Sequence, residues 1–254
     1  IMDGVTSSAA ELNLLDGNPT NAARYNLAVG VTALDAISNG YHNLAVGNNS
    51  LTNTTTGSSN TGIGSMALQA NISGSFNTAV ANGALYANTT GNNNVAVGYD
   101  ALSSNTTGAN NTALGYQSLL SNTTASNNTA YGYYSLKVNT TGSQNTAYGS
   151  GSMQSNTTSN NTAYGYYSMN SNTTGSHNVA VGFESLRYNT TASNNTSLGY
   201  QSLRANSTGA TNTATGSYSL YSNTTGTDNT AFGYASLETN TTGNSNAVYG
   251  ASSG

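Results

Sequence analysis

An asparagine returns at a nearly constant interval along this chain, and that interval constrains the fold more than any other feature. The sequence step between successive repeat asparagines is 17, as from Asn26 to Asn43, with a single step of 16. A unit this short cannot hold the helical hairpins of common repeat proteins, which need about 33 to 47 residues, and its threonine, asparagine and glycine are poor helix formers. The period therefore predicts stacked coils of β-structure. The repeat asparagines are Asn26, Asn43, Asn60, Asn77, Asn94, Asn111, Asn128, Asn145, Asn161, Asn178, Asn195, Asn212, Asn229 and Asn246.

The unit has a consistent internal pattern. Numbered 1 to 17 from its asparagine, it reads N-T-A-x-G-Y-x-S-L-x-x-N-T-T-G-x-x. Alternation over the first five positions predicts a short strand, with positions 2 and 4 on one face and the Ala and Gly of positions 3 and 5 on the other. The N-T-T-G segment favours a turn that closes the coil, because Asn and Gly tolerate left-handed backbone conformations. Each unit is thus expected to form one turn of a solenoid.

Position 9 supplies the expected core. It is Leu or Met in every unit that reaches it, and coils stacked about 4.8 Å apart would place these side chains over one another. The predicted fold class is all-β, a parallel β-solenoid or β-roll of about fourteen 17-residue turns over residues 26–254. The predicted core ladder comprises Leu34, Leu51, Leu68, Leu85, Leu102, Leu119, Leu136, Met153, Met169, Leu186, Leu203, Leu220 and Leu237.

Two details of the repeat lead to further expectations. The asparagines of positions 1 and 12 form either inward amide ladders, as in cross-β assemblies, or simple turns. The one shortened unit, Asn145 to Asn160, lacks a loop residue and should tighten one turn without breaking the rod.

The thin coil predicts association with other copies of the chain. So short a coil encloses little volume, so its core is expected to be insufficient alone, and a parallel homotrimer suits a rod. The Ala and Gly columns are expected to form a flat face where the backbones of neighbouring chains approach. The drift at position 4 from Val29 and Val46 to Tyr131 and Tyr148 also predicts an interface between chains there.

Residues 1–25 differ from the repeat and predict a separate element. Ser8 to Glu11 has the spacing of a capping box, and Leu12, Leu14 and Leu15 follow it. A short helix ending near Gly17 is expected, and three such helices around a threefold axis would bury their leucines together, like a coiled coil, and set the register of the chains.

Composition narrows the classes of function. Charged residues make up 5% of the chain, which carries a net charge of -4, and there is no cysteine. With four Lys and Arg in total, the basic footprint of a nucleic-acid-binding protein is missing. No apolar run approaches the roughly 20 residues of a membrane span.

The residues that could carry chemistry do not form a catalytic pattern. His42 and His177 are far apart in sequence and are interpreted as surface-loop residues, and the eight carboxylates are scattered. We therefore predict no enzyme activity, no metal site and no cofactor. The charged members of position 10, Lys137, Arg187, Arg204 and Glu238, mark that position as facing solvent.

Position 6 is the candidate binding column. Its aromatic side chains should stack along one edge of the rod, where their faces could contact sugar rings; purely structural stacking is the simpler alternative. The members of this possible glycan-contact column are Tyr99, Tyr116, Tyr133, Tyr166, Phe183, Tyr200 and Tyr234.

Two segments resemble known families. The sequence D-G-V-T-S-S-A-A-E-L-N-L-L-D-G at residues 3–17 resembles elements of phage tail-fibre proteins. The repeat over residues 26–250 resembles repeats of tail-fibre proteins that often end in an endosialidase-type intramolecular chaperone. Its N-x-A-x-G core is also similar to the N-S-V-A-I-G motif of trimeric autotransporter adhesin heads, which are left-handed parallel β-rolls.

The resemblance implies a trimeric fibre shaft in a virion tail, which supports adhesion to a host receptor. Its partners would be its own copies, other virion tail proteins and a host-surface glycan or receptor. The alternatives are a bacterial trimeric adhesin or extracellular filament subunit at the cell surface, and an ice-binding solenoid with ordered threonines. Because the chain opens on Ile1 and no chaperone segment follows Gly254, it is expected to be an excerpt or a processed form.

Overall fold

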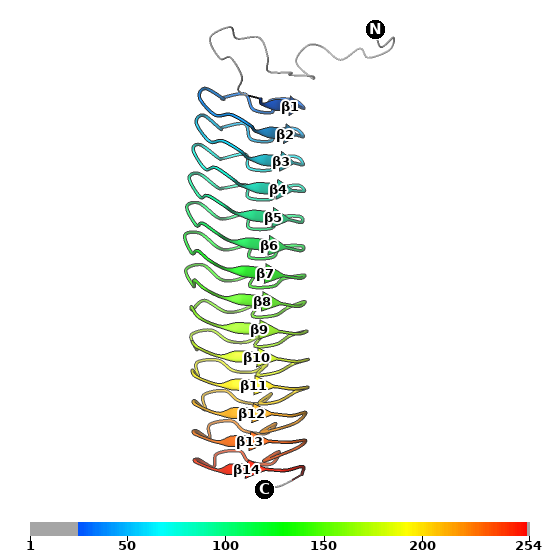
Figure 1. Ribbon diagram of the computed structural model, residues 1–254, viewed down its shortest axis with the longest axis vertical. Helices are drawn as coiled ribbons and strands as arrows, with labels where there is room; N and C mark the ends of the chain where they lie inside the picture. The colour runs from blue at the N-terminus through cyan, green and yellow to red at the C-terminus, as the bar shows by residue number, and fades with distance from the viewer. Residues whose placement is uncertain (1–24, 253–254) are drawn as a thin grey trace, which may run out of the picture.

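The computed structural model describes residues 25–252, which form one rod of stacked coils (Figure 1). Each repeat asparagine is followed by a strand of three residues. The strands are β1 Leu27–Val29, β2 Leu44–Val46, β3 Thr61–Ile63, β4 Thr78–Val80, β5 Val95–Val97, β6 Thr112–Leu114, β7 Thr129–Tyr131, β8 Thr146–Tyr148, β9 Thr162–Tyr164, β10 Val179–Val181, β11 Thr196–Leu198, β12 Thr213–Thr215, β13 Thr230–Phe232 and β14 Ala247–Tyr249.

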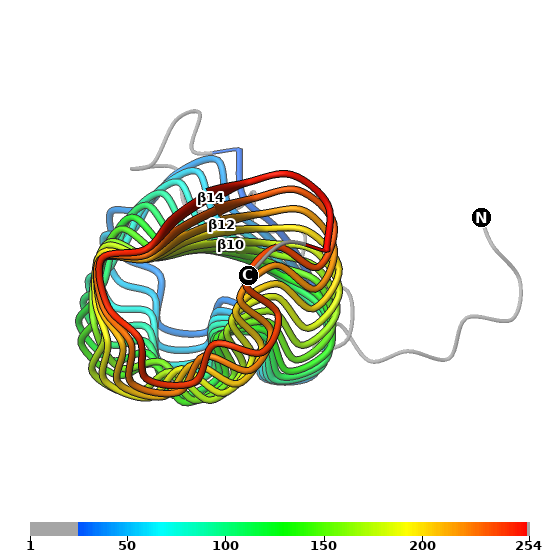
Figure 2. The same ribbon diagram turned by 90° about the horizontal axis from the view of Figure 1, so that it is seen from below.

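All strands belong to one 14-stranded sheet whose order follows the chain from β1 to β14. Each strand pairs in parallel with the next at equivalent positions, so that Ala28 lies beside Ala45. Seen from the end, the coils superimpose with a gradual rotation, and the labelled strands lie on one side of the rod (Figure 2). The expected parallel β-solenoid is therefore confirmed, with about 13 turns spaced 17 residues apart.

Each strand has only three residues because a sharp turn at the position-5 glycine follows it directly. Alanine at position 3 points into the coil and is fully buried, as at Ala180, while positions 2 and 4 point outward. The chain then turns sharply at position 5, where Gly182 has a φ of +132°. A Cβ atom on Gly182 would lie 2.3 Å from the carbonyl oxygen of Gly199 in the next coil. Glycine is thus required by the backbone conformation and by the close approach of adjacent coils.

Position 9 forms the centre of the core. All thirteen residues predicted for the core ladder are buried, from Leu34 to Leu237. These residues also adopt left-handed backbone conformations, with a φ of +53° at Leu119. That conformation costs an L-residue about 1–2 kcal/mol, whereas full burial of a leucine side chain contributes about 1.5–3 kcal/mol. Burial therefore offsets a backbone conformation that leucine would otherwise avoid.

One expectation about the surface is wrong. The alanines of position 3 lie inside the coil, and the glycines of position 5 face the backbone of the next coil in the same chain. These two columns therefore cannot form a flat face against neighbouring chains. The reason is volume: so short a closed coil leaves room for leucine only if the facing strand carries small side chains.

The asparagines of positions 1 and 12 form buried amide ladders, which decides between the two alternatives left open by the sequence. At position 1, the backbone N–H of Asn128 donates to Oδ1 of Asn111 (3.0 Å), and its Nδ2 donates to the carbonyl of Gly142 (2.9 Å). At position 12, Nδ2 of Asn105 donates to Oδ1 of Asn88 (2.9 Å). The amide fits because it offers a donor and an acceptor from one short side chain.

Replacing Asn128 by aspartate should strongly destabilise the rod. The carboxylate would lose the donor that satisfies the Gly142 carbonyl and would be buried close to that oxygen. Leaving one buried polar group unpaired costs about 1–3 kcal/mol, and more for a charge. We expect a large drop in the urea midpoint measured by circular dichroism. The exposed Asn110→Asp variant is the matched control, and equal losses in the two variants would contradict the buried ladder.

The shortened unit confirms the expectation for a missing loop residue. Strands β8 and β9 remain in register, with Tyr148 beside Tyr164. The carbonyl of Thr158 accepts hydrogen bonds from Asn145 (2.8 Å) and Asn156 (2.7 Å). It thereby takes the place of the position-15 carbonyl that the deletion removes, and the stack continues.

The predicted N-terminal helix and most of the 1–25 segment lie outside the described residues. The part of the chain from 25 to 252 contains strands and turns but no helix. It follows that this part also holds no helix with the length and apolar character of a membrane span.

Candidate functional site

The aromatic residues of position 6 project from the corner that follows the position-5 glycine. Their side chains are between 40 and 57% exposed, so their faces and edges reach solvent. Tyr99, Tyr116 and Tyr133 form one stack with ring centroids 5.5 Å apart. A second stack joins Tyr166, Phe183 and Tyr200 at 5.3 and 5.2 Å. Ser150 and Ser217 interrupt the column, and Tyr234 lies beyond the second gap.

Tyrosines of position 7 widen this surface toward the next side of the coil. The ring of Tyr134 lies 3.9 Å from that of Tyr133, and the ring of Tyr167 lies 4.4 Å from that of Tyr166. A hydrogen bond with Tyr134, together with burial, raises the pKa of Tyr133 to about 12.

The cations of position 10 lie over tyrosine rings. Nζ of Lys137 is 3.9 Å from the ring centroid of Tyr134, and the Arg187 guanidinium is 5.1 Å from that of Tyr167. Arg204 lies 5.0 Å from the ring centroid of Tyr188. Such cation–π contacts hold the charge against an aromatic face. These side chains are half-buried, whereas Glu238 in the same column is exposed, so position 10 faces solvent only in part.

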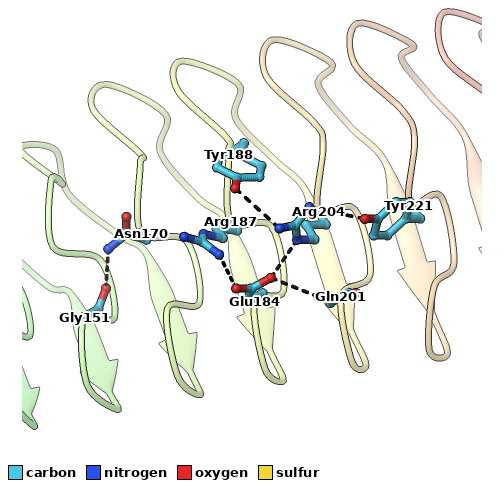
Figure 3. A network of polar contacts seen from close by, with 8 residues as sticks. All are labelled: Gly151, Asn170, Glu184, Arg187, Tyr188, Gln201, Arg204 and Tyr221. Carbon is cyan, nitrogen blue, oxygen red and sulfur yellow. Dashed lines mark hydrogen bonds and ion pairs between the residues drawn. The ribbon is translucent and has the colours of Figure 1, made fainter.

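Glu184 links two of these cations into a network (Figure 3). Its side chain, at position 7, is paired with Nη1 of Arg187 in its own coil and accepts a hydrogen bond from Nε of Arg204 in the next coil (2.7 Å). Nε2 of Gln201 donates a third bond to it (2.9 Å). Arg204 also donates to the hydroxyl of Tyr221 at 3.2 Å. Three donors thus hold one carboxylate that is almost fully buried beneath the surface of the rod.

The environment of Glu184 keeps it ionised. Burial raises the pKa of the carboxyl, but the hydrogen bonds from Arg204 and Gln201 and the charges of the two arginines outweigh burial, so the pKa lies below its usual value. The contribution of this carboxylate to stability is therefore present above the unfolded-state pKa and is lost as pH falls through the lower folded-state pKa.

Sequence reasoning did not find this network. Glu184 and Arg204 belong to different repeat units, and their separation along the chain hides their contact in a linear reading. The contact could have been predicted from the repeat, because two residues separated by one full repeat plus three positions place position 7 beside position 10 of the following coil.

A second aromatic ladder occurs at position 4, on the outer face of the sheet. The rings of Tyr131 and Tyr148 are 4.7 Å apart, and those of Tyr148 and Tyr164 are 4.5 Å apart with an interplanar angle of 1°. The expected interface between chains at this position stays a prediction. What the structure adds is that these side chains point away from the core and are exposed.

The two histidines lie at exposed sites. His42 stacks on Tyr25 at 5.4 Å, and Nδ1 of His177 lies 3.1 Å from Oγ of Ser176. Among residues 25–252, no group of three or more His, Asp or Glu side chains is placed to hold a metal ion. The arrangement instead offers aromatic and cationic contacts along the rod. Comparison of the chain with protein-family models, curated proteins and solved structures finds no match.

Proposed function

We propose that this chain is the shaft of a phage tail fibre, which assembles as a parallel homotrimer and supports adhesion to a host receptor. The observation that carries the proposal is the continuous, in-register sheet of 14 strands, which makes a rod whose length grows with each coil. At a strand spacing of about 4.8 Å, the rod is roughly 65 Å long. The sequence resemblance to tail-fibre repeats supplies the virion context.

The outer face of the sheet supports self-association. Apolar or aromatic side chains occupy position 4 in every coil except the one with Thr215, and they include exposed Ile63, Val181 and Phe232. An apolar column of this length, interrupted only at Thr215, is unusual on the surface of a monomer. Parallel chains around a common axis would bury the same column from each copy. The resemblance to trimeric families selects three copies.

Lysine substitutions on the outer face should dissociate the assembly. We expect light scattering after size-exclusion chromatography to give three times the chain mass for the native protein and one chain mass for a Val97→Lys, Tyr148→Lys double variant. The desolvation cost of lysine in an apolar interface is the reason. Lysines at position 10, Ser103→Lys and Gln154→Lys, form the matched control and should leave the trimer intact. A monomeric native rod, or a trimer that survives both lysines at position 4, would contradict this interface.

The virion context requires a separate experiment. Mass spectrometry of purified phage particles should detect peptides that span the repeats, such as those between Lys137 and Arg187. Detection only in the surface fraction of uninfected bacteria would instead support the bacterial adhesin and exclude a tail-fibre shaft.

A further inference from the structure

The few cations of the described residues are concentrated on one face and in one stretch of the rod. Thirteen coils extend to position 10, and all three cations, Lys137, Arg187 and Arg204, occupy that position. Between residues 101 and 227 the only carboxylate side chain is that of Glu184, so this stretch carries a net positive charge within a chain of net charge -4. The acids Asp35, Asp100, Asp228 and Glu238 lie outside this stretch. The middle of the rod therefore presents a local positive potential.

Tyrosines surround these cations from adjacent coils. They come from positions 7, 10 and 11; the side chain of Tyr188 is exposed, and the other four are half-buried. We refer to these tyrosines and the three cations together as the cationic tyrosine band. The tyrosines of the band are Tyr134, Tyr167, Tyr188, Tyr218 and Tyr221.

The contacts within the band position its charges before any ligand arrives. Glu184 is almost buried at 7% exposure and neutralises one of the two arginines that it contacts. Arg204 is held between Glu184 and the hydroxyls of Tyr188 (3.4 Å) and Tyr221. Arg187 forms fewer contacts: its one ion pair uses Nη1, and 25% of its side-chain surface is exposed, although its Nε is buried without a hydrogen-bond partner among the described residues. A guanidinium with spare donors beside aromatic rings is suited to a carboxylate carried on an apolar ring face.

We propose that the cationic tyrosine band is a binding subsite for an acidic polysaccharide, one whose pyranose rings carry carboxylates. The carboxylates pair with Arg187 and Lys137, and the tyrosine rings pack against the sugar faces. Lys137 and Arg187 lie three coils apart in the stack, so a ligand that contacts both must extend along the rod. This inference rests on the proposed attachment role for its biological meaning, and it shifts the sugar contact from position 6 alone to the neighbouring face of positions 7, 10 and 11.

A polysaccharide fits this band better than a nucleic acid. Nucleic-acid binding relies on many Lys and Arg contacts to closely spaced phosphates, and a protein of net charge -4 with three cations here cannot supply them. A sparse carboxylate polymer needs fewer cations and gains from the aromatic surface between them.

The test uses the complete chain and polygalacturonate as the probe, with neutral dextran and poly-glutamate as comparisons. We expect affinity electrophoresis to show retardation by polygalacturonate only. The Lys137→Gln, Arg187→Gln double variant should bind about tenfold more weakly, which corresponds to a loss of about 1.4 kcal/mol for the two solvent-screened contacts together. Tyr188→Ala should weaken binding without a change in net charge. Unchanged circular dichroism would show that each variant is folded.

A charge-relocated variant separates a built site from general electrostatics. It carries the same two glutamines together with Ala109→Lys and Ala210→Lys at position 16, which restores the net charge on another part of the coil. Failure of this variant to bind polygalacturonate supports the band. Restored binding, equal binding of poly-glutamate, or no binding by the native chain would overturn the proposal. The oligomeric state and the virion content are measured separately. A negative result in the polygalacturonate experiment therefore does not contradict the shaft proposal, which has its own tests.

Discussion

Replacing Leu119 by aspartate is expected to disrupt the rod around its coil. Leu119 is fully buried in the position-9 ladder, and its backbone N–H donates to the carbonyl of Ser135 in the next coil (2.9 Å). Leucine-to-alanine changes in cores cost about 2–5 kcal/mol, and aspartate adds an unpaired buried carboxylate. We therefore expect a loss of more than about 5 kcal/mol. Since each coil contacts only its neighbours, the damage should divide the stack into two weaker halves.

The adjacent Leu120 offers a matched control for this change. It occupies position 10 and is partly exposed, so Leu120→Asp places the same carboxylate at the next position without burying it. Thermal unfolding followed by circular dichroism should show a large loss for Leu119→Asp and a small one for Leu120→Asp. The same result is expected at Leu136 and Leu186, which occupy position 9 in other coils. Similar midpoints for the two adjacent variants would contradict the assigned core.

Replacing Gly182 by alanine is expected to have the second-largest effect. The new Cβ would lie 2.3 Å from the carbonyl oxygen and 2.6 Å from the carbonyl carbon of Gly199, at a φ of +132°. Backbone strain of this kind costs about 1–3 kcal/mol, and the clash requires two coils to separate locally. The loss should therefore exceed that of a typical surface substitution by several-fold.

The chain contains its own comparison for the glycine column. Ala81 is the one member of position 5 that is not glycine, and it has a φ of +112°. Ala81→Gly should stabilise the rod by about 1 kcal/mol, because it relieves strain in the folded state. Opposite signs for Gly182→Ala and Ala81→Gly in chemical unfolding are the expected result. Stabilisation by both changes, or by neither, would show that the positive φ and the close approach of the next coil do not require glycine at position 5.

The repeat period predicted much of the fold because its physical meaning is local. A short unit with one leucine and two asparagines can be completed only by identical neighbours, which requires stacked coils in register. The buried ladder from Leu34 to Leu237 and the tolerance of the shortened unit followed from this reasoning. The sequence left the amide ladders as one of two alternatives, since asparagine is also common in solvated turns.

The candidate site was less accessible from the sequence. The position-6 aromatics were visible as a column, but the interruptions at Ser150 and Ser217 leave two separate stacks. The network of Glu184 with Arg204 was missed because it forms between coils and depends on which side chains reach across the gap.

By itself, the amino-acid sequence determined the repeat, the all-β class, the parallel register and the identity of the core ladder, because periodicity states which residues must lie over one another. Only the tertiary structure decided which face of each strand is inside. Alternation places positions 3 and 5 on one face and positions 2 and 4 on the other, but it does not say which face points into the coil. Closure of the coil decides which face is inside, because the volume left by the position-9 leucine accommodates alanine and excludes the larger side chains of position 4. For the same reason the tyrosines and valines of that position face outward, where a second chain could cover them.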